Sequence, residues 1–511
     1  MNSRMAKSGV NAVTAVTQNL LNIGLTFISR MIFVQVLNAE YLGISSLFSN
    51  VLNVLALADL GMGTAMMYSL YKPLAQNDKT AICAYINFFK KIYFWIVTAV
   101  IVLGIALIPV LPYIINLDKA IEHYQIYYVL YLTNVAISYL FAYRITLINA
   151  DQKSYILNNY AMFFKILTFI GQTVVLIKFR NFLIYLIVEV GSNFLCYFTQ
   201  NFAVVKRYPY IKNKAEKLAK EQKYEIKENV KSLFIYKLCG TLQGNTDTIF
   251  ISILCGTVNV GYYSNYLIVI NAITTLMSVV FTSVKASVGN MVASITTHEQ
   301  EIKIFWILQF VNDWMISFCS ICLFCLLQEC INLFFGDEYV VPFVVMVAIV
   351  VNFYSVNSFQ AIWVFRETTG LFNQTRYIAL ITAVLNAALS LVMGLRWGMF
   401  GILIATSISR YLYMAWKEPL LLFKNFFKTN PKLYFINYIK KTIWLLIVSI
   451  ITYYSCSLIK MQNVYVSFGI KCMTCLLIPN VIFLCCFYKT EEFQYLWNMV
   501  MNIAMNKRKE N

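Results

Sequence analysis

The sequence has few charged residues for its length. Asp, Glu, Lys and Arg make up 13% of its 511 residues, whereas 60% are hydrophobic. A soluble globular chain carries about 25% charged residues, so this scarcity excludes an ordinary soluble protein. Apolar runs of about 20 residues recur from end to end, which is the length that a helix needs to cross a bilayer. The sequence therefore predicts a polytopic membrane protein.

Histidine is nearly absent. The chain has two, His123 and His298, and neither lies near closely spaced cysteines. Thirteen cysteines are present, with the tightest spacings in CSICLFC (319–325) and CMTC (472–475). Both segments lie inside apolar runs, where a free cysteine behaves as a small hydrophobe. We therefore predict no metal site and no cofactor.

The motifs of ATP-driven and hydrolytic chemistry are also missing. GTLQGNTD (240–247) is rich in glycine but lacks the GK[ST] ending of a phosphate-binding loop. The chain contains no HExxH and no GxSxG motif. The longest loop on the predicted outer side, around 110–123, is too short for a catalytic domain. We expect a protein that is not an enzyme and that ATP does not drive directly.

Fourteen apolar segments are candidate transmembrane helices, and they predict an all-α membrane fold. An even number of spans places both termini on the same side of the membrane. Most of the 41 Lys and Arg lie in the termini and in the loops on that side, which identifies it as the cytoplasm. The predicted spans are 11–36, 44–68, 90–113, 124–148, 155–178, 182–205, 232–255, 262–286, 304–328, 340–365, 376–395, 398–423, 439–460 and 464–488.

A basic segment divides these spans into groups. Residues 206–231 read KRYPYIKNKAEKLAKEQKYEIKENVK and favour a surface helix near anionic lipid headgroups on the cytoplasmic side. We predict an N-terminal six-helix bundle (1–205), a C-terminal six-helix bundle (232–423), and two additional helices with a cytoplasmic tail (424–511).

An internal repeat supports this division. YLGISSLFSNVLNV (41–54) aligns with NVGYYSNYLIVINA (259–272), so that Gly43 pairs with Gly261. Because six spans per half give both halves the same orientation, we expect two parallel bundles that face a central cavity. The same register pairs Asn53 with Asn271, Thr64 with Thr282, Ser69 with Ser287 and Ala75 with Ala293.

An arginine interrupts the first apolar run. FISRMIFVQVL (27–37) contains Arg30, and one cation near the middle of a membrane helix costs roughly 2.5–3.5 kcal/mol to insert. Such a residue is expected to face the bundle interior or a water-filled cavity. Polar residues at three- and four-residue steps form one stripe that includes Arg30 and a second that ends at Lys285. The stripes comprise Asn11, Ala15, Asn19, Asn22, Thr26 and Arg30, and Asn271, Thr274, Ser278, Thr282 and Lys285.

Ionisable residues within the predicted spans are the candidate site residues. The candidate substrate-binding cations are Arg30, Lys285, Arg410 and Arg144, and the candidate coupling or cavity carboxylates are Asp59, Asp247 and Glu189. Lys165 and Asp313 complete the set, and for both of them and for Glu189 we favour structural pairing or snorkelling over a functional role. Arg144 lies near enough to the cytoplasmic end of its span to snorkel as well. Asn, Ser and Thr on these faces often form interhelical hydrogen bonds instead of substrate contacts.

Cations outnumber carboxylates among these candidates, five to four. A cavity with excess positive charge suits an anionic ligand, since Arg offers a forked pair of donors to phosphate and Lys a point charge. The aromatic content of 16% includes 35 tyrosines. Tyrosine at helix ends usually forms an interfacial belt, although rings that face a cavity can pack against sugars.

Three stretches carry a resemblance to a known family. They are ISRMIFVQVLNAEYLGISSLFSNVL (28–52), ADLGMGTA (58–65) and NTDTIFISILCGTVNVGYYSNYLIVINAI (245–273). With the layout of six, six and two spans, the chain resembles the Wzx-type polysaccharide flippases. These belong to the superfamily of multidrug, oligosaccharidyl-lipid and polysaccharide exporters. By this similarity Arg30, Asp59 and Asp247 sit in family-like motifs, whereas Lys285 and Arg410 rest on the stripe argument alone.

The resemblance implies a function at the bacterial cytoplasmic membrane. It implies alternating-access transport of an undecaprenyl-pyrophosphate-linked oligosaccharide from the inner to the outer leaflet. The implied partners are this lipid-linked oligosaccharide, bilayer lipids and the polysaccharide polymerase machinery, with no nucleic acid. A cation-coupled multidrug exporter of the same fold, a membrane-embedded glycan polymerase and a channel stay open as alternatives. The sugars and the coupling ion are open as well.

Overall fold

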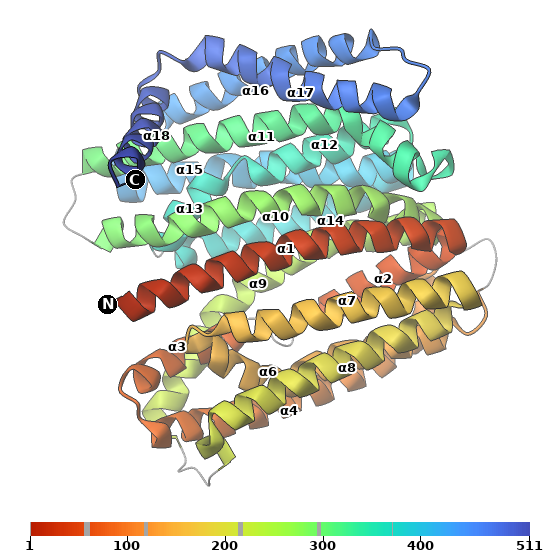
Figure 1. Cartoon of the computed structure of the whole chain (residues 1–511), viewed down its shortest axis with the longest axis vertical. Helices are drawn as coiled ribbons and strands as arrows, with labels where there is room; N and C mark the ends of the chain where they lie inside the picture. The colour runs from red at the N-terminus through yellow and green to blue at the C-terminus, as the bar shows by residue number, and fades with distance from the viewer. Residues whose placement is uncertain are drawn as a thin grey trace. The chain divides into compact units, whose positions relative to one another are not determined.

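The structure, a computed structural model, consists of helices joined by short turns (Figure 1). No strand occurs among the residues that it describes. The predicted all-α fold class is confirmed. The described residues are 2–55, 62–116, 121–212, 218–293, 298–369 and 371–510.

Contacts between helices divide the chain into two compact units, Met1–Ser264 and Asn265–Asn511. The boundary between Ser264 and Asn265 lies within α10 (Thr257–Ala293). The α9 helix (Lys220–Cys255) belongs to the first unit because it packs on α2, α3 and α5. The predicted division at 206–231 rests on the internal repeat and stays a prediction.

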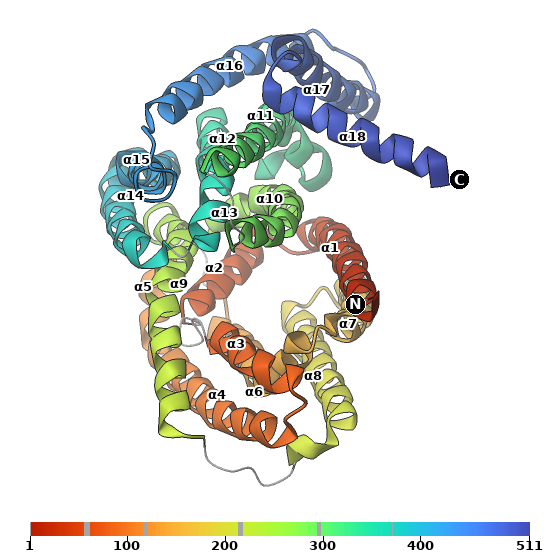
Figure 2. The ribbon, with the colours of Figure 1, turned by 90° about the vertical axis from the view of Figure 1, so that its left-hand side faces the viewer.

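The first unit is built mainly from long helices, and some of those that pack together are far apart in the sequence. The α1 helix packs against α7, α7 against α8, and α6 against both α4 and α8 (Figure 2). These contacts place α1, α7 and α8 around a common interior. Besides α9 and the first part of α10, the helices are α1 (Asn2–Val36), α2 (Ala39–Leu55), α3 (Met62–Ala75), α4 (Lys79–Leu107), α5 (Leu111–Ile114), α6 (Tyr124–Ala150), α7 (Ser154–Phe179) and α8 (Phe182–Arg207).

The α6, α7 and α8 helices lie where the sequence predicts spans 124–148, 155–178 and 182–205, with every end within two residues. The turn between α7 and α8 shows why. Arg180 ends α7 in the left-handed region at a φ of 49°, and the Asn181 side chain accepts a hydrogen bond from the Ile184 amide at 3.2 Å. A left-handed residue followed by an asparagine cap ends one helix and begins the next.

The predicted span 44–68 forms two helices among the described residues. The α2 helix ends at Leu55 and α3 begins at Met62. The candidate carboxylate Asp59 lies between them, outside the described residues.

Two glycines that the internal repeat aligns allow α2 and α10 to cross closely. A Cβ atom at Gly261 would lie 2.7 Å from the carbonyl oxygen of Ala39 and 3.0 Å from the amide nitrogen of Gly43. A Cβ atom at Gly43 would overlap the carbonyl oxygen of Thr257. Real Cβ atoms do not approach backbone this closely, so both positions require glycine. The crossing fixes the first turns of α10 against the start of α2.

The start of the basic segment 206–231 is anchored by the buried Tyr208 and the half-buried Tyr210. Tyr208 donates its hydroxyl to Asp151 at 2.5 Å, and burial raises the pKa of Tyr210 to about 12. Both rings therefore stay neutral at pH 7. Helical structure resumes at Lys220, the first residue of α9.

The second unit contains a helical segment that reverses direction. Within α14 (Phe372–Ser409), Gly398 has a φ of 59° and a ψ of −139°. A Cβ atom at Gly401 would overlap the carbonyl of Met393, although eight residues of straight helix would separate the two by about 12 Å. The chain therefore folds back here, between the predicted spans 376–395 and 398–423. The other helices are α11 (His298–Phe335), α12 (Phe343–Asn357), α13 (Gln360–Thr368), α15 (Ala415–Leu422), α16 (Lys432–Ser457), α17 (Val464–Phe487) and α18 (Glu491–Glu510).

Eleven helical segments of the described chain are long and apolar enough to cross a membrane. One of them, Tyr377–Phe427, has 51 residues and includes the reversal at Gly398. Large apolar side chains such as Trp95, Leu446 and Leu477 are exposed on the helix surfaces, as expected for side chains that meet lipid. The chain is a multi-pass membrane protein. The count of fourteen spans stays a prediction.

Candidate functional site

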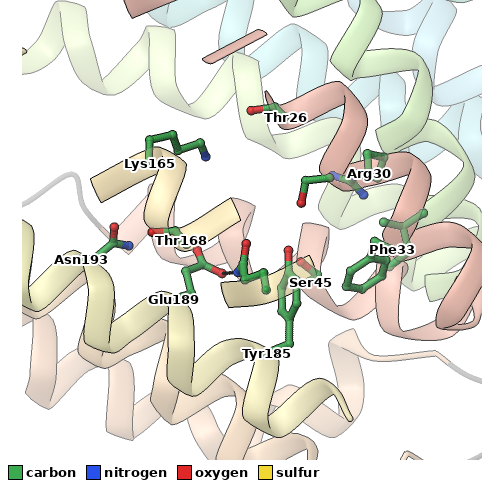
Figure 3. Close-up of a pocket in the computed structure, with 12 residues that line it drawn as sticks. Thr26, Arg30, Phe33, Ser45, Lys165, Thr168, Tyr185, Glu189 and Asn193 are labelled. Carbon is green, nitrogen blue, oxygen red and sulfur yellow. Dashed lines mark hydrogen bonds between the residues drawn. The ribbon is translucent and has the colours of Figure 1, made fainter. Parts of the chain in front are cut away.

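A polar cavity of about 160 Å³ lies inside the first unit (Figure 3). It is lined by residues of α1, α2, α7 and α8. The described part of its lining holds one carboxylate, without histidine or cysteine, so these residues are not the ligand set of a zinc site. The lining residues are Thr26, Ser29, Arg30, Phe33, Leu42, Ser45, Lys165, Thr168, Gln172, Tyr185, Glu189 and Asn193.

Arg30 projects from α1 into this cavity. Its Nη1 donates to the hydroxyl of Ser264 at 3.2 Å, and that hydroxyl donates in turn to the Gly261 carbonyl at 2.8 Å. Ser264 lies one turn beyond Gly261, so the close glycine crossing sets the position of this hydroxyl. Among the residues that the structure describes, no carboxylate lies within 4.0 Å of the guanidinium. The guanidinium therefore keeps donors available for a ligand.

Glu189 lies across the cavity on α8. Its Oε2 accepts a weak hydrogen bond from Gln172 of α7 at 3.4 Å (Figure 3). Lys165, also on α7, lines the same cavity, and in the described part of the chain neither Lys165 nor Glu189 has an ion-pair partner within 4.0 Å. The cavity thus contains two cations and one carboxylate. Its described lining has a net positive charge when all three groups are ionised.

An aromatic wall borders the charged groups. The rings of Phe33 and Tyr185 meet edge to face with centroids 5.4 Å apart, and Tyr185 stacks on Phe182 at 6.1 Å. Amphipathic rings beside a charged pocket offer a flat surface of the kind that packs against sugar rings. The cavity therefore combines donors for an anion with a surface for a glycan.

The remaining polar groups of the cavity hold its helices together. The hydroxyls of Thr168 and Ser192 lie 2.6 Å apart, and Asn193 donates to Asn134 at 2.9 Å. These bonds join α7 to α8 and α8 to α6. They are the interhelical bonds that the sequence leaves open for Asn, Ser and Thr.

Lys285 lies in the second unit, where it pairs with Glu367 of α13. The neighbouring Arg366 approaches Glu367 at 3.8 Å and donates to Glu418 of α15 at 2.5 Å. Trp363 also donates to Glu418, at 2.9 Å. The sequence interpretation missed this network because Arg366 and Glu367 come directly after the predicted end of a span. A charged pair at such an end could have indicated it.

The other candidates lie apart from the polar cavity's lining. Arg410 is buried and donates to Ser355 at 3.3 Å, and Arg144 donates to Asn201 at 2.7 Å. Asp247 is 5% exposed on α9. The structure therefore brings Arg30 and Glu189 of the candidates together with Lys165.

Comparisons with known proteins identify the fold. No protein-family model and no curated protein matches the sequence. Among solved structures, the chain is similar to the lipid II flippase MurJ in its inward closed conformation. The TM-score is 0.69 at 16% identity, over 93% of this chain and 98% of that chain.

Two multidrug transporters are similar as well. An inward-facing multidrug resistance transporter of the MATE family, in the MOP superfamily, matches with a TM-score of 0.55 at 13% identity, over 79% of this chain and 97% of that chain. A mutant of the Vibrio cholerae MATE transporter VcmN matches with a TM-score of 0.52 at 11% identity. The match covers 83% of this chain and 100% of that chain. The chain has the fold of these transporters. At such identities the similarity is one of fold.

Three residues that line the cavity, Gln172, Tyr185 and Asn193, were missed by sequence reasoning although a signal was present. Tyr185, Glu189 and Asn193 recur at four-residue steps, and Lys165 and Gln172 share a face of α7. All of them line the cavity. Extending the stripe analysis to every span would have grouped them around Glu189.

Proposed function

We propose that the protein is a flippase that moves an undecaprenyl-pyrophosphate-linked oligosaccharide from the inner to the outer leaflet of the bacterial cytoplasmic membrane. The observation that carries this proposal is the polar cavity in which Arg30 and Lys165 lie without a close carboxylate among the described residues. The similarity of the fold to a lipid II flippase supports it. Transport, not catalysis, is the proposed activity.

The chemistry of this cargo explains the charges. A diphosphate and a hydrated glycan cannot cross about 30 Å of hydrocarbon unaided, because their polar groups would lose water. The guanidinium of Arg30 can hold two phosphate oxygens at once, and the ammonium of Lys165 adds a second positive charge. The rings of Tyr185 and Phe33 supply the surface for a sugar.

A second cavity favours a lipid-linked cargo over a soluble one. It has about 360 Å³, is lined by Tyr411 and by residues of α11, α12 and α16 of the second unit, and most of its lining side chains are aliphatic or aromatic. Leu446 and Ile450 at this cavity are more than half exposed on the helix surface, where lipid would meet them. A prenyl chain has the chemistry to occupy such a space.

The cycle that we propose is alternating access through the cationic cavity of the first unit. Moving one elementary charge through 100 mV is worth about 2.3 kcal/mol, enough to bias the cycle without ATP. Both termini are cytoplasmic in this proposal, and the polysaccharide polymerase machinery receives the product. In the proposed roles, Lys285, Arg410 and Arg144 are further phosphate-binding cations, and Asp59, Asp247 and Glu189 are coupling or cavity carboxylates.

A cation-coupled multidrug exporter is the second candidate. The likeness to MATE transporters and the position of Glu189 in the cavity favour it, since a carboxylate can bind a cationic drug. The two candidates differ in the sign of the cargo. An excess of cations over carboxylates in the described lining favours the flippase.

Reconstitution distinguishes them. Proteoliposomes that contain the purified protein and a fluorescent undecaprenyl-pyrophosphate-linked disaccharide should show reagent-accessible label in the opposite leaflet after an ion gradient or membrane potential is imposed, with no ATP added. A lipophilic cationic dye in parallel vesicles should not accumulate. Dye transport without movement of the lipid-linked sugar would replace the flippase by the exporter, and strict dependence on ATP would reject both.

A further inference from the structure

Three cysteine sulfurs meet in the interior of the second unit. Cys325 of α11, Cys456 of α16 and Cys475 of α17 are buried, and their sulfur atoms all lie within 4.8 Å of one another. The sulfurs of Cys456 and Cys475 are 3.5 Å apart. Each helix packs against the other two, so three separate segments bring the thiols to one point (Figure 1).

We propose that Cys325, Cys456 and Cys475 form a trigonal thiolate site for a soft monovalent metal ion, Cu(I). Bonds of about 2.3 Å from three sulfurs to one ion place the sulfurs about 4.0 Å apart. The Cys456–Cys475 separation is 3.5 Å and the other two are at most 4.8 Å, so small side-chain rotations are enough to close the site. Soft thiolate ligands select Cu(I) or Zn(II) over harder ions.

The number of ligands favours copper over zinc. Structural zinc almost always takes four ligands, and the group that the structure describes contains three cysteines and no histidine or carboxylate. Cys322 lies one turn before Cys325, but it is not a member of the group, and its sulfur is 3.8 Å from the carbonyl oxygen of Cys475. A three-coordinate ion fits this set without a further ligand.

One lysine lies near the proposed site, whose charge is negative. Three thiolates around Cu(I) carry a net charge of −2, which an apolar interior disfavours. Lys471 lies one turn before Cys475 on α17, and its carbonyl oxygen is 4.0 Å from the sulfur of Cys456. Its ammonium pairs with Glu329 of α11, so the pair is neutral as a whole, and the lysine offsets the charge of the metal site only if it leaves Glu329.

The site is closed by apolar packing but lies near a helix end. Ile321, Leu445 and Val448 pack with the three cysteines in one buried cluster. Cys456 is the next-to-last residue of α16, so the short connection to α17 offers a route for the ion. This placement separates metal binding from the polar cavity's chemistry, and the proposal stands whether or not the cargo is a lipid-linked sugar.

Copper binding to the purified full-length protein tests the site. Under anaerobic conditions with ascorbate, the wild-type protein should retain one Cu(I) per chain against a bicinchoninate competitor, and X-ray absorption should show three sulfurs at about 2.3 Å. Cys475→Ala should weaken binding at least tenfold. The matched control is Cys485→Ala, an exposed cysteine on the same helix, which should bind as wild type does.

Three results would overturn the proposal. They are wild-type copper retention no greater than that of Cys475→Ala, a four-coordinate zinc site with no affinity for Cu(I), and a Cys456–Cys475 disulfide in protein extracted from cells with a thiol-blocking reagent. The absorption spectrum of the wild type needs no variant, so the proposal stays testable if Cys475→Ala fails to fold. Circular dichroism and gel filtration of each variant report that folding directly.

Discussion

The charged side chains inside the first unit can be compared with those inside the second. In the first, Arg30 and Lys165 share a cavity with Glu189, and no described carboxylate lies within 4.0 Å of either cation. In the second, four of the described cations have a carboxylate partner, whereas the buried Arg410 donates to Ser355. These pairs are Lys285 with Glu367, Arg366 with Glu418, Lys441 with Asp313, and Lys471 with Glu329.

This difference in pairing indicates which charges stabilise the fold and which are available to bind a ligand. A cation that is paired and buried supports the packing of its helices, and removing one partner leaves the other charge uncompensated. A cation that faces a polar cavity without a carboxylate partner contributes little to packing, and its burial costs free energy until an anionic ligand binds. The comparison therefore assigns the ligand to the first unit and a structural role to most charges of the second.

The largest effect is expected when the buried pair of the second unit is broken. Arg366 and Glu418 are each about 2% exposed, so Arg366→Ala should lower the free energy of unfolding by about 3–5 kcal/mol. Thermal unfolding in detergent and the level of protein in membranes measure this. The double change of Arg366→Met with Glu418→Leu should recover most of the loss, because no charge is left unpaired. A single variant as stable as wild type would contradict the structural role.

A loss of transport with little loss of stability is expected at Arg30. Hydrogen bonds to charged groups contribute about 1.5–3 kcal/mol, so Arg30→Ala should slow flipping about 10- to 150-fold, and Arg30→Lys should recover part of the rate. The control is Arg396→Ala, an exposed arginine near the reversal of α14. Complementation of a flippase-deficient strain, with membrane protein levels measured alongside, gives the readout. Full surface glycan from a well-expressed Arg30→Ala variant would make the arginine structural.

An intermediate effect on stability is expected at the close crossing of α2 and α10, where Gly43 and Gly261 meet. Gly261→Ala places a methyl group 2.7 Å from the Ala39 carbonyl oxygen, and such overpacking should cost about 1–3 kcal/mol and displace Ser264 from Arg30. Gly24→Ala in α1 is the matched control, since nothing lies within 4 Å of its Cβ position. Replacing that helical glycine should leave stability unchanged or raise it by about 0.5–1 kcal/mol. Equal stability of the two variants, measured by thermal unfolding, would refute the close crossing.

The smallest stability effect is expected at Lys285. The side chain is 43% exposed and its partner Glu367 is 24% exposed, so the pair should contribute about 0.2–1 kcal/mol. Lys285→Ala should nevertheless slow flipping if the lysine exchanges Glu367 for phosphate, as we propose. Glu367→Gln separates the two roles, because it breaks the pair and keeps the cation. If both variants flip at the wild-type rate, Lys285 belongs with the structural charges of the second unit.

The structural features that could be predicted from the sequence are those that depend on a single helix. Long apolar runs gave the all-α class, and the polar stripe with Arg30 pointed toward an interior. The bounds of α6, α7 and α8 followed because each helix ends at a clear turn signal such as Asn181. Gly43 and Gly261 were aligned by the repeat, although their contact needed the structure.

Features that depend on the relative register of several helices were not predictable. Arg30, Lys165 and Glu189 come from α1, α7 and α8, and no local pattern shows that their side chains share one cavity. The pair of Arg366 with Glu418 also joins two separate helices, so no local pattern predicts it. Likewise, each of the three cysteines lies in its own apolar run, where it was interpreted as a small hydrophobic residue. Register is set by packing of whole helix faces, which a single sequence does not encode in any short motif.

Binding of the diphosphate headgroup tests the central claim most directly. The protein in lipid nanodiscs is titrated with a short-chain prenyl-pyrophosphate-linked disaccharide, and the dissociation constant is measured for wild type, Arg30→Ala, Arg30→Lys and Arg396→Ala. We expect the dissociation constant to rise about 10- to 150-fold for Arg30→Ala and by an intermediate factor for Arg30→Lys. It should not change for Arg396→Ala. Equal dissociation constants for wild type and a folded Arg30→Ala variant would contradict it.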